Sequence, residues 1–151
     1  MTKRQQLQSN SDPFYAAFRG AFTNLLRWDD LERFWGVLRA QAGDGWYVYA
    51  IGEPAPETPL PADTIRAFIS EIDALLRREH QEDYCGIVYV DDKTDPTFVK
   101  IYDPGNLGVV CGYSDNPPLP GWILSRVTPK SLEDKGFRTG TRRTWWRRLW
   151  N

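Results

Sequence analysis

The N-terminal part of the chain carries apolar side chains at helical spacing. Ser11-Asp12-Pro13 predicts a helix start, because a capping side chain precedes a proline whose missing N–H costs nothing in a first turn. Asp29 and Asp30 can begin a second helix, since acids in a first turn suit the helix dipole. The pattern leaves open whether there are two helices or one bent helix. The apolar positions are Phe14, Ala17, Phe18, Ala21, Leu25 and Trp28, followed by Leu31, Phe34, Trp35 and Leu38.

A strand, a proline-rich segment and a longer helix come next. Residues 46–51 are rich in aromatic and branched side chains, which predicts a strand. The prolines at 54, 56, 59 and 61 favour an extended polyproline II segment. Residues 62–79 keep the helical period for three turns, which predicts a long amphipathic helix. Its apolar positions are Ile65, Phe68, Ile69, Ile72, Leu75 and Leu76.

The second half of the chain changes from helical to strand-like patterns. Short apolar and aromatic runs alternate with turn signals such as Asp103-Pro104-Gly105-Asn106. We therefore predict an α+β fold with two layers, in which the N-terminal helices and one long central helix pack on a mostly antiparallel sheet of about four to five strands. The predicted strands are residues 46–51, 84–90, 97–102, 107–111 and 122–127, and the second and third of these form a hairpin.

Charge divides the chain into two unlike parts. Residues 135–151 carry six cationic side chains and no acid, and the whole chain sums to −1, so residues 1–134 carry −7. We expect a single α+β domain over residues 1–134 and a basic, tryptophan-rich tail over residues 135–151. The boundary between them is soft and lies near residues 132–140.

The tail favours a helix whose apolar face includes one arginine. At 100° per residue, the tryptophans at 145, 146 and 150 fall with Leu149 inside an arc of about 140°, and Arg142 lies in it too. Thr141 is a candidate N-cap. Isolated helices below about 12–15 residues are marginal in water, so the tail must be ordered by a contact. The candidate binding residues are Arg142, Arg143, Trp145, Trp146, Arg147, Arg148 and Trp150.

Four contacts suit such a tail: its own acidic body, a protein partner or second copy, an anionic membrane surface, or a nucleic acid. Tryptophan and arginine are the residues most enriched at binding hot spots. The preference for arginine over lysine suits bidentate recognition of carboxylates. The acidic body counts against nucleic acid, which usually meets a continuous basic face. One apolar turn buries little area in a membrane, so attachment there would be weak and dependent on salt.

Composition limits the class of protein. Aromatic residues make up 14% of the chain, which argues against a disordered body. No apolar stretch approaches the roughly 20 residues that span a bilayer, and the N-terminal segment MTKRQQLQSNSD lacks the apolar core of a signal peptide. We therefore expect a cytoplasmic protein of bacterial type without a transmembrane segment.

Aspartates gather around the predicted hairpin and form the one candidate metal site. Carboxylate oxygens are the ligands that hard divalent cations prefer. The spacing does not match an EF-hand loop, however, and Lys93 lies among the acids. A solvated turn is the favoured interpretation, because aspartate is a normal turn residue. The weak metal candidates are Asp91, Asp92, Asp95 and Asp103.

The remaining reactive side chains give no recognisable catalytic motif. His80 is the single histidine, which excludes sites built on two imidazoles, and its place at a helix end suggests a structural role. A catalytic pair with Cys85 stays an alternative. Cys85 and Cys111 are predicted to lie at opposite ends of the sheet as free thiols. No G-x-S-x-G, H-E-x-x-H or paired C-x-x-C sequence is present, and we expect no cofactor.

These observations favour a small accessory protein that binds other proteins without catalysis. Its tail would dock on its own body, on a protein partner or on a second copy of the chain. Two alternatives stay open. One is an enzyme that uses carboxylates or a divalent metal in the hairpin between Asp91 and Asp103, and the other is a peripheral binder of anionic membranes or nucleic acids through the tail.

Overall fold

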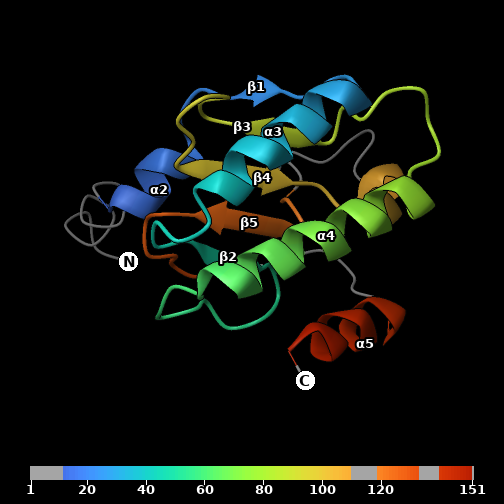
Figure 1. Cartoon of the computed structure of the whole chain (residues 1–151). Coiled ribbons are helices and arrows are strands. Elements are labelled where there is room, and N and C mark those ends of the chain that lie inside the picture. Colours follow the sequence, from blue (N-terminus) through green and yellow to red (C-terminus); the bar gives the residue numbers. More distant parts are fainter. Residues whose placement is uncertain (1–11, 110–118, 133–139, 151) are drawn as a thin grey trace.

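The computed structural model describes residues 12–109, 119–132 and 140–150, and it contains a five-stranded sheet with helices packed on it (Figure 1). All strand pairs are antiparallel, in the order β1-β3-β4-β5-β2. The predicted α+β class is therefore confirmed. The strands are β1 (Thr23–Asn24), β2 (Tyr47–Ala50), β3 (Val88–Val90), β4 (Phe98–Ile101) and β5 (Trp122–Ser125). The helices are α2 (Pro13–Phe18), α3 (Trp28–Ala40), α4 (Ala62–Glu79) and α5 (Gly140–Leu149), with a 3-10 helix η1 (Pro104–Val109).

Strand alternation places a core on each face of the sheet. On β5, Trp122 and Leu124 join the larger cluster under α3 and α4, whereas Ile123 joins a smaller cluster on the opposite face. Phe14 of α2 closes that second cluster against Phe98 of β4, with their ring centroids 5.5 Å apart. Because both faces are covered, every residue of β5 is buried.

The first helix is shorter than its apolar pattern suggests. The start is confirmed, since the Asp12 carboxylate accepts a 2.8 Å hydrogen bond from the Phe14 amide. The helix ends at Phe18, and the Gly20 amide bonds back to Ala17. The continuation of the helical pattern to Leu25 is therefore wrong, and the chain forms two helices with the short strand β1 between them. An edge strand of two residues is too short to show its own period.

The second half keeps the predicted hairpin but not the strand at residues 107–111. Helix α4 has the predicted bounds, and β3 and β4 pair in the expected antiparallel register. Residues 107–109 belong to η1 instead, because the Asp103 carboxylate and carbonyl accept the amides of Gly105 and Asn106 and close a tight turn. Residues 110–111 lie outside the described part of the chain. Strand β5 takes the place beside β4 and pairs with β2 on its other side.

None of the helices in the described ranges combines the length and the apolar character needed to cross a bilayer.

Candidate functional site

The tail forms helix α5, and this helix lies against the body of its own chain (Figure 1). The predicted helix is thus confirmed, although it begins at Gly140, so Thr141 falls inside its first turn and is not the N-cap. The partly buried side chains of Trp146, Leu149 and Trp150 pack against the larger core cluster. These contacts give a ten-residue helix the order that it would lack in isolation.

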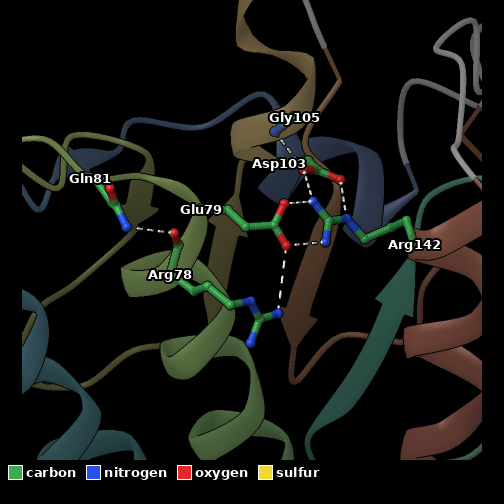
Figure 2. A network of polar contacts seen from close by, with 6 residues as sticks. All are labelled: Arg78, Glu79, Gln81, Asp103, Gly105 and Arg142. Atoms are coloured by element: carbon green, nitrogen blue, oxygen red, sulfur yellow. Dashed lines mark hydrogen bonds and ion pairs between the residues drawn. The ribbon is translucent and has the colours of Figure 1, made fainter.

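Arg142 is the centre of the docking site. Its side chain reaches two carboxylates from distant parts of the chain (Figure 2). The Nε and Nη2 atoms donate to Asp103 at 2.9 and 2.8 Å, and Nη1 and Nη2 donate to Glu79 at 2.9 Å each. Arg142 is 7% exposed and Asp103 is 8% exposed, so most of this pairing takes place away from water. Two bidentate contacts use all the nitrogens of one planar guanidinium.

The charges in this triad stabilise one another. Hydrogen bonds from Arg142 lower the pKa of the Glu79 carboxyl, against an opposing effect of burial. Burial by itself would lower the pKa of Arg142, but the bonds to Glu79 and Asp103 outweigh it and raise that pKa above its usual value. Glu79 ends α4, where the helix dipole disfavours an anion, and Arg142 offsets that disadvantage. Arg78 adds a second cation 3.6 Å from the Glu79 carboxylate.

Two glycines make room for Asp103. Its Oδ1 atom accepts a hydrogen bond of 2.8 Å from the Gly105 amide, which helps to orient the carboxylate toward Arg142. A methyl group at Gly121 would lie 3.0 Å from the Asp103 Cβ atom, and one at Gly105 would lie 3.2 Å from Oδ1. Nothing in the sequence marks this role, because a glycine that makes room for a neighbouring backbone looks like any other loop glycine.

Tryptophans form the apolar half of the docking site. Trp145 is 5% exposed, and its ring meets the ring of Trp122 edge to face at 5.5 Å and 67°. The Arg142 guanidinium lies 5.7 Å from the Trp122 ring as well. Trp146 and Trp150 form a second edge-to-face pair at 4.9 Å. Such pairs add to the stabilisation that comes from apolar burial alone.

The opposite face of α5 is basic and exposed. Arg143 and Arg147 lie on this face and are exposed. Arg148 is exposed too, but it lies on the flank of α5 next to α4. None of the three has an ion pair within the described ranges of the chain. The seven candidate tail residues therefore divide by burial. Arg142 and Trp145 are buried, Trp146 and Trp150 are half-buried, and the other three arginines are free to meet something else.

The four aspartates suggested as metal ligands do not come together. The Asp91 carboxylate accepts the amides of Thr97 and Phe98, and Asp92 accepts the amides of Thr94 and Asp95. The pKa of Asp92 is lowered by these backbone donors. Asp103 follows the other end of β4 and binds Arg142. Among the residues described, no group of three or more His, Cys, Asp or Glu side chains is placed to hold a metal.

His80 and Cys85 are close, but not as a catalytic pair. The Nε2 atom of His80 lies 2.9 Å from the backbone oxygen of Cys85, not from its sulfur. Burial raises the pKa of the Cys85 thiol, which disfavours the thiolate that a nucleophile needs. The contact ties the end of α4 to the segment that leads into β3. Cys85 is a free thiol, and Cys111 lies outside the described residues.

No protein-family model matches this chain, and neither the curated proteins nor the solved structures contain a match to it.

Proposed function

We propose that this chain is a small cytoplasmic accessory protein without catalytic activity, which binds an acidic surface of a protein partner through the outward face of α5. One observation carries the proposal. The inner face of α5 is anchored on the body by Arg142 and Trp145, while the outer face presents Arg143 and Arg147 without ion pairs among the described residues.

The docked helix is a preorganised platform for such a partner. Arg143 and Arg147 are four positions apart and therefore lie on the same side of the helix. Because the body already orders the helix, binding of a partner does not have to offset the conformational entropy that is lost when the helix folds. A planar guanidinium group can donate two parallel hydrogen bonds to one carboxylate, which matches aspartate and glutamate side chains on a protein surface.

The same geometry argues against the other tail-binding ligands. The apolar face of α5 is occupied by its own body, so its tryptophans are not available for insertion into a membrane interface. Nucleic acids would meet a short basic strip beside residues 1–134, which carry −7. Phosphate backbones are usually bound by a longer continuous basic surface.

Affinity capture with paired charge reversals tests the proposal. The bait is the full chain, in a lysate of the source cells, and bound proteins are identified by mass spectrometry. We expect the double variant R143E/R147E to lose a protein that the wild type retains. The control is R126E/K130E, which makes the same change in charge at exposed positions away from α5 and should retain the partner.

Three results would overturn the proposal. The first is equal capture by both double variants and the wild type, and the second is equal loss by both, which would indicate an effect of net charge alone. The third is binding of the wild type to anionic vesicles or duplex DNA at 150 mM salt, with no captured protein. Circular dichroism of each variant confirms that the fold is unchanged before binding is compared.

A further inference from the structure

A hollow of about 330 Å³ lies between the last turn of α4 and helix α5. We propose that it binds a small molecule that carries a phosphate group. The proposal does not depend on a protein partner for α5, because the hollow faces other side chains than Arg143 and Arg147. It is lined by Arg78, Glu79, Arg142, Thr144, Trp145 and Arg148.

The charges around the hollow favour an anion. Arg142 is already paired with Glu79 and Asp103, and this triad keeps a net charge of −1, so attraction for an anion must come from the two other arginines of the hollow, Arg78 and Arg148. Arg78 lies 3.6 Å from Glu79 and has a side chain that is 60% exposed, so this contact is weak. Arg148 is exposed and has no ion pair within the part of the chain that the structure describes. Two guanidinium groups therefore keep donors for a ligand.

Packing brings these two arginines to the same place from separate helices. Arg78 belongs to α4 and Arg148 to α5, and the pairing of Arg142 with Glu79 holds the two helices together (Figure 2). Like charges that line one hollow repel each other, and an anion between them removes that repulsion. Two other lining residues are held by contacts of their own: Glu79 by Arg142 and Trp145 by Trp122. Side chains that are already ordered lower the entropic cost of binding.

The geometry favours a phosphate group on a small molecule. A phosphate offers three acceptor oxygens and close to two negative charges, which match two guanidinium forks better than one carboxylate does. Ligand pockets usually measure about 300–1,000 Å³. A hollow of about 330 Å³ lies at the lower limit of that range, so the ligand is a monophosphate with a small body and not a dinucleotide.

NMR titration of the full chain tests the proposal. ¹H–¹⁵N spectra are recorded with inorganic phosphate and with glycerol phosphate, at constant ionic strength maintained with sodium chloride. We expect saturable shifts of the Trp145 indole and of amides near Arg78 and Arg148. In the R78A/R148A variant, both dissociation constants should rise at least tenfold, because both free guanidinium groups are gone.

The matched control removes the same charge from the other face of α5. The R143A/R147A variant should bind both phosphates within twofold of the wild type, even if it fails to capture a protein partner. This separates the phosphate site from the function proposed above. A third variant, R78K/R148K, keeps both charges but removes the forks, and we expect intermediate affinity.

Each contrary result is clear. The proposal is overturned if no saturable shift is seen, if the two alanine pairs weaken binding equally, or if R78A/R148A binds as the wild type does. It is also overturned if a phosphoserine peptide binds while inorganic phosphate and glycerol phosphate do not, because the ligand would then be a macromolecule. Thermal unfolding of the variants shows that these exposed substitutions leave the fold intact.

Discussion

Strand β4 has an acidic site at each end, and the two sites use the same chemistry differently. Before the strand, Asp91 accepts amides from residues six and seven positions away in its own hairpin. After the strand, Asp103 accepts hydrogen bonds from the guanidinium of Arg142, which is 39 positions away. The first site closes a local turn, whereas the second holds a separate helix on the body. A cluster of acids in a sequence does not reveal which of these it will do.

Removing Arg142 should have the largest effect on stability, and it should affect the Asp103 site but not the Asp91 site. In Arg142→Ala, Asp103 and Glu79 stay close together without their counterion, and breaking such a pair costs about 3 kcal/mol of the free energy of unfolding. Helix α5 loses its anchor, so we expect its amides to exchange with solvent much faster than those of α4. Urea denaturation and hydrogen exchange measure the two effects.

The neighbouring arginine gives the control for that prediction. Arg143→Ala removes an exposed cation from the same turn of α5 and should change stability by less than about 0.5 kcal/mol. If both variants lost the same stability, burial of the Arg142 pairing would not be what matters. If Arg142→Ala left exchange in α5 unchanged, the tryptophan contacts alone would suffice to dock the helix.

Filling the space beside Asp103 should have the next largest effect. In Gly121→Ala the new methyl group would lie 3.0 Å from the Asp103 Cβ atom, which Arg142 and Gly105 hold in place. We expect a loss of about 2 kcal/mol from overpacking, measured by urea denaturation. Gly36→Ala is the contrast, because a methyl group at this position inside α3 would meet no atom within 4 Å. Alanine in the middle of a helix should raise the free energy of unfolding by about 0.5–1 kcal/mol relative to glycine. Equal behaviour of the two variants would contradict the close packing.

The hairpin site should cost less to remove and should not affect α5. Asp91→Ala leaves the amides of Thr97 and Phe98 without their acceptor, and we expect a loss of about 1 kcal/mol. Hydrogen exchange should rise in β3 and β4 and stay unchanged in α5. Asp95→Ala, at an exposed position of the same turn, serves as the control and should be close to neutral. Faster exchange in α5 of the Asp91 variant would show that the two ends of β4 are coupled.

The smallest expected difference between the two acidic sites is in how their carboxyl groups respond to low pH. The pKa of Glu79 is lowered in the folded chain by Arg142, so this contribution to stability is complete above the ordinary pKa that the carboxyl has in the unfolded chain. It is lost as pH falls below that value and through the lower folded pKa. In Arg142→Ala, carboxyl NMR should show the Glu79 pKa returning upward, while the pKa of Asp92 stays low because its backbone donors are unchanged. A Glu79 pKa that did not move would mean that Arg142 is not its cause.

The sequence predicted those parts of the fold that depend on local periodicity. Helix α4 has its six apolar positions where the period placed them, and the β3–β4 hairpin follows from its turn residues. The helical arc of the tail even placed Arg142 among the tryptophans, and among the arginines of α5 it is the buried one. Patterns that repeat within a few residues are visible in a sequence without knowledge of the fold.

The parts that could not be predicted depend on residues far apart in the chain. Glu79 lies 63 positions from Arg142, and nothing in its own segment distinguishes it from an exposed glutamate at a helix end. Asp103 resembled its neighbours in the hairpin, and the 3-10 turn that it forms replaced the predicted strand over residues 107–109. Trp122 looked like any strand aromatic until the fold placed it under Trp145. Only tertiary structure distinguishes these roles.

The order of the Arg142 triad along the chain has a consequence for truncated chains. Glu79 and Asp103 both precede Arg142, so a chain interrupted before position 142 contains the two carboxylates without their shared counterion. If such a chain folded, the two carboxylates would repel each other at the end of the sheet. We therefore expect a chain interrupted before position 142 to be less stable than one that includes this arginine.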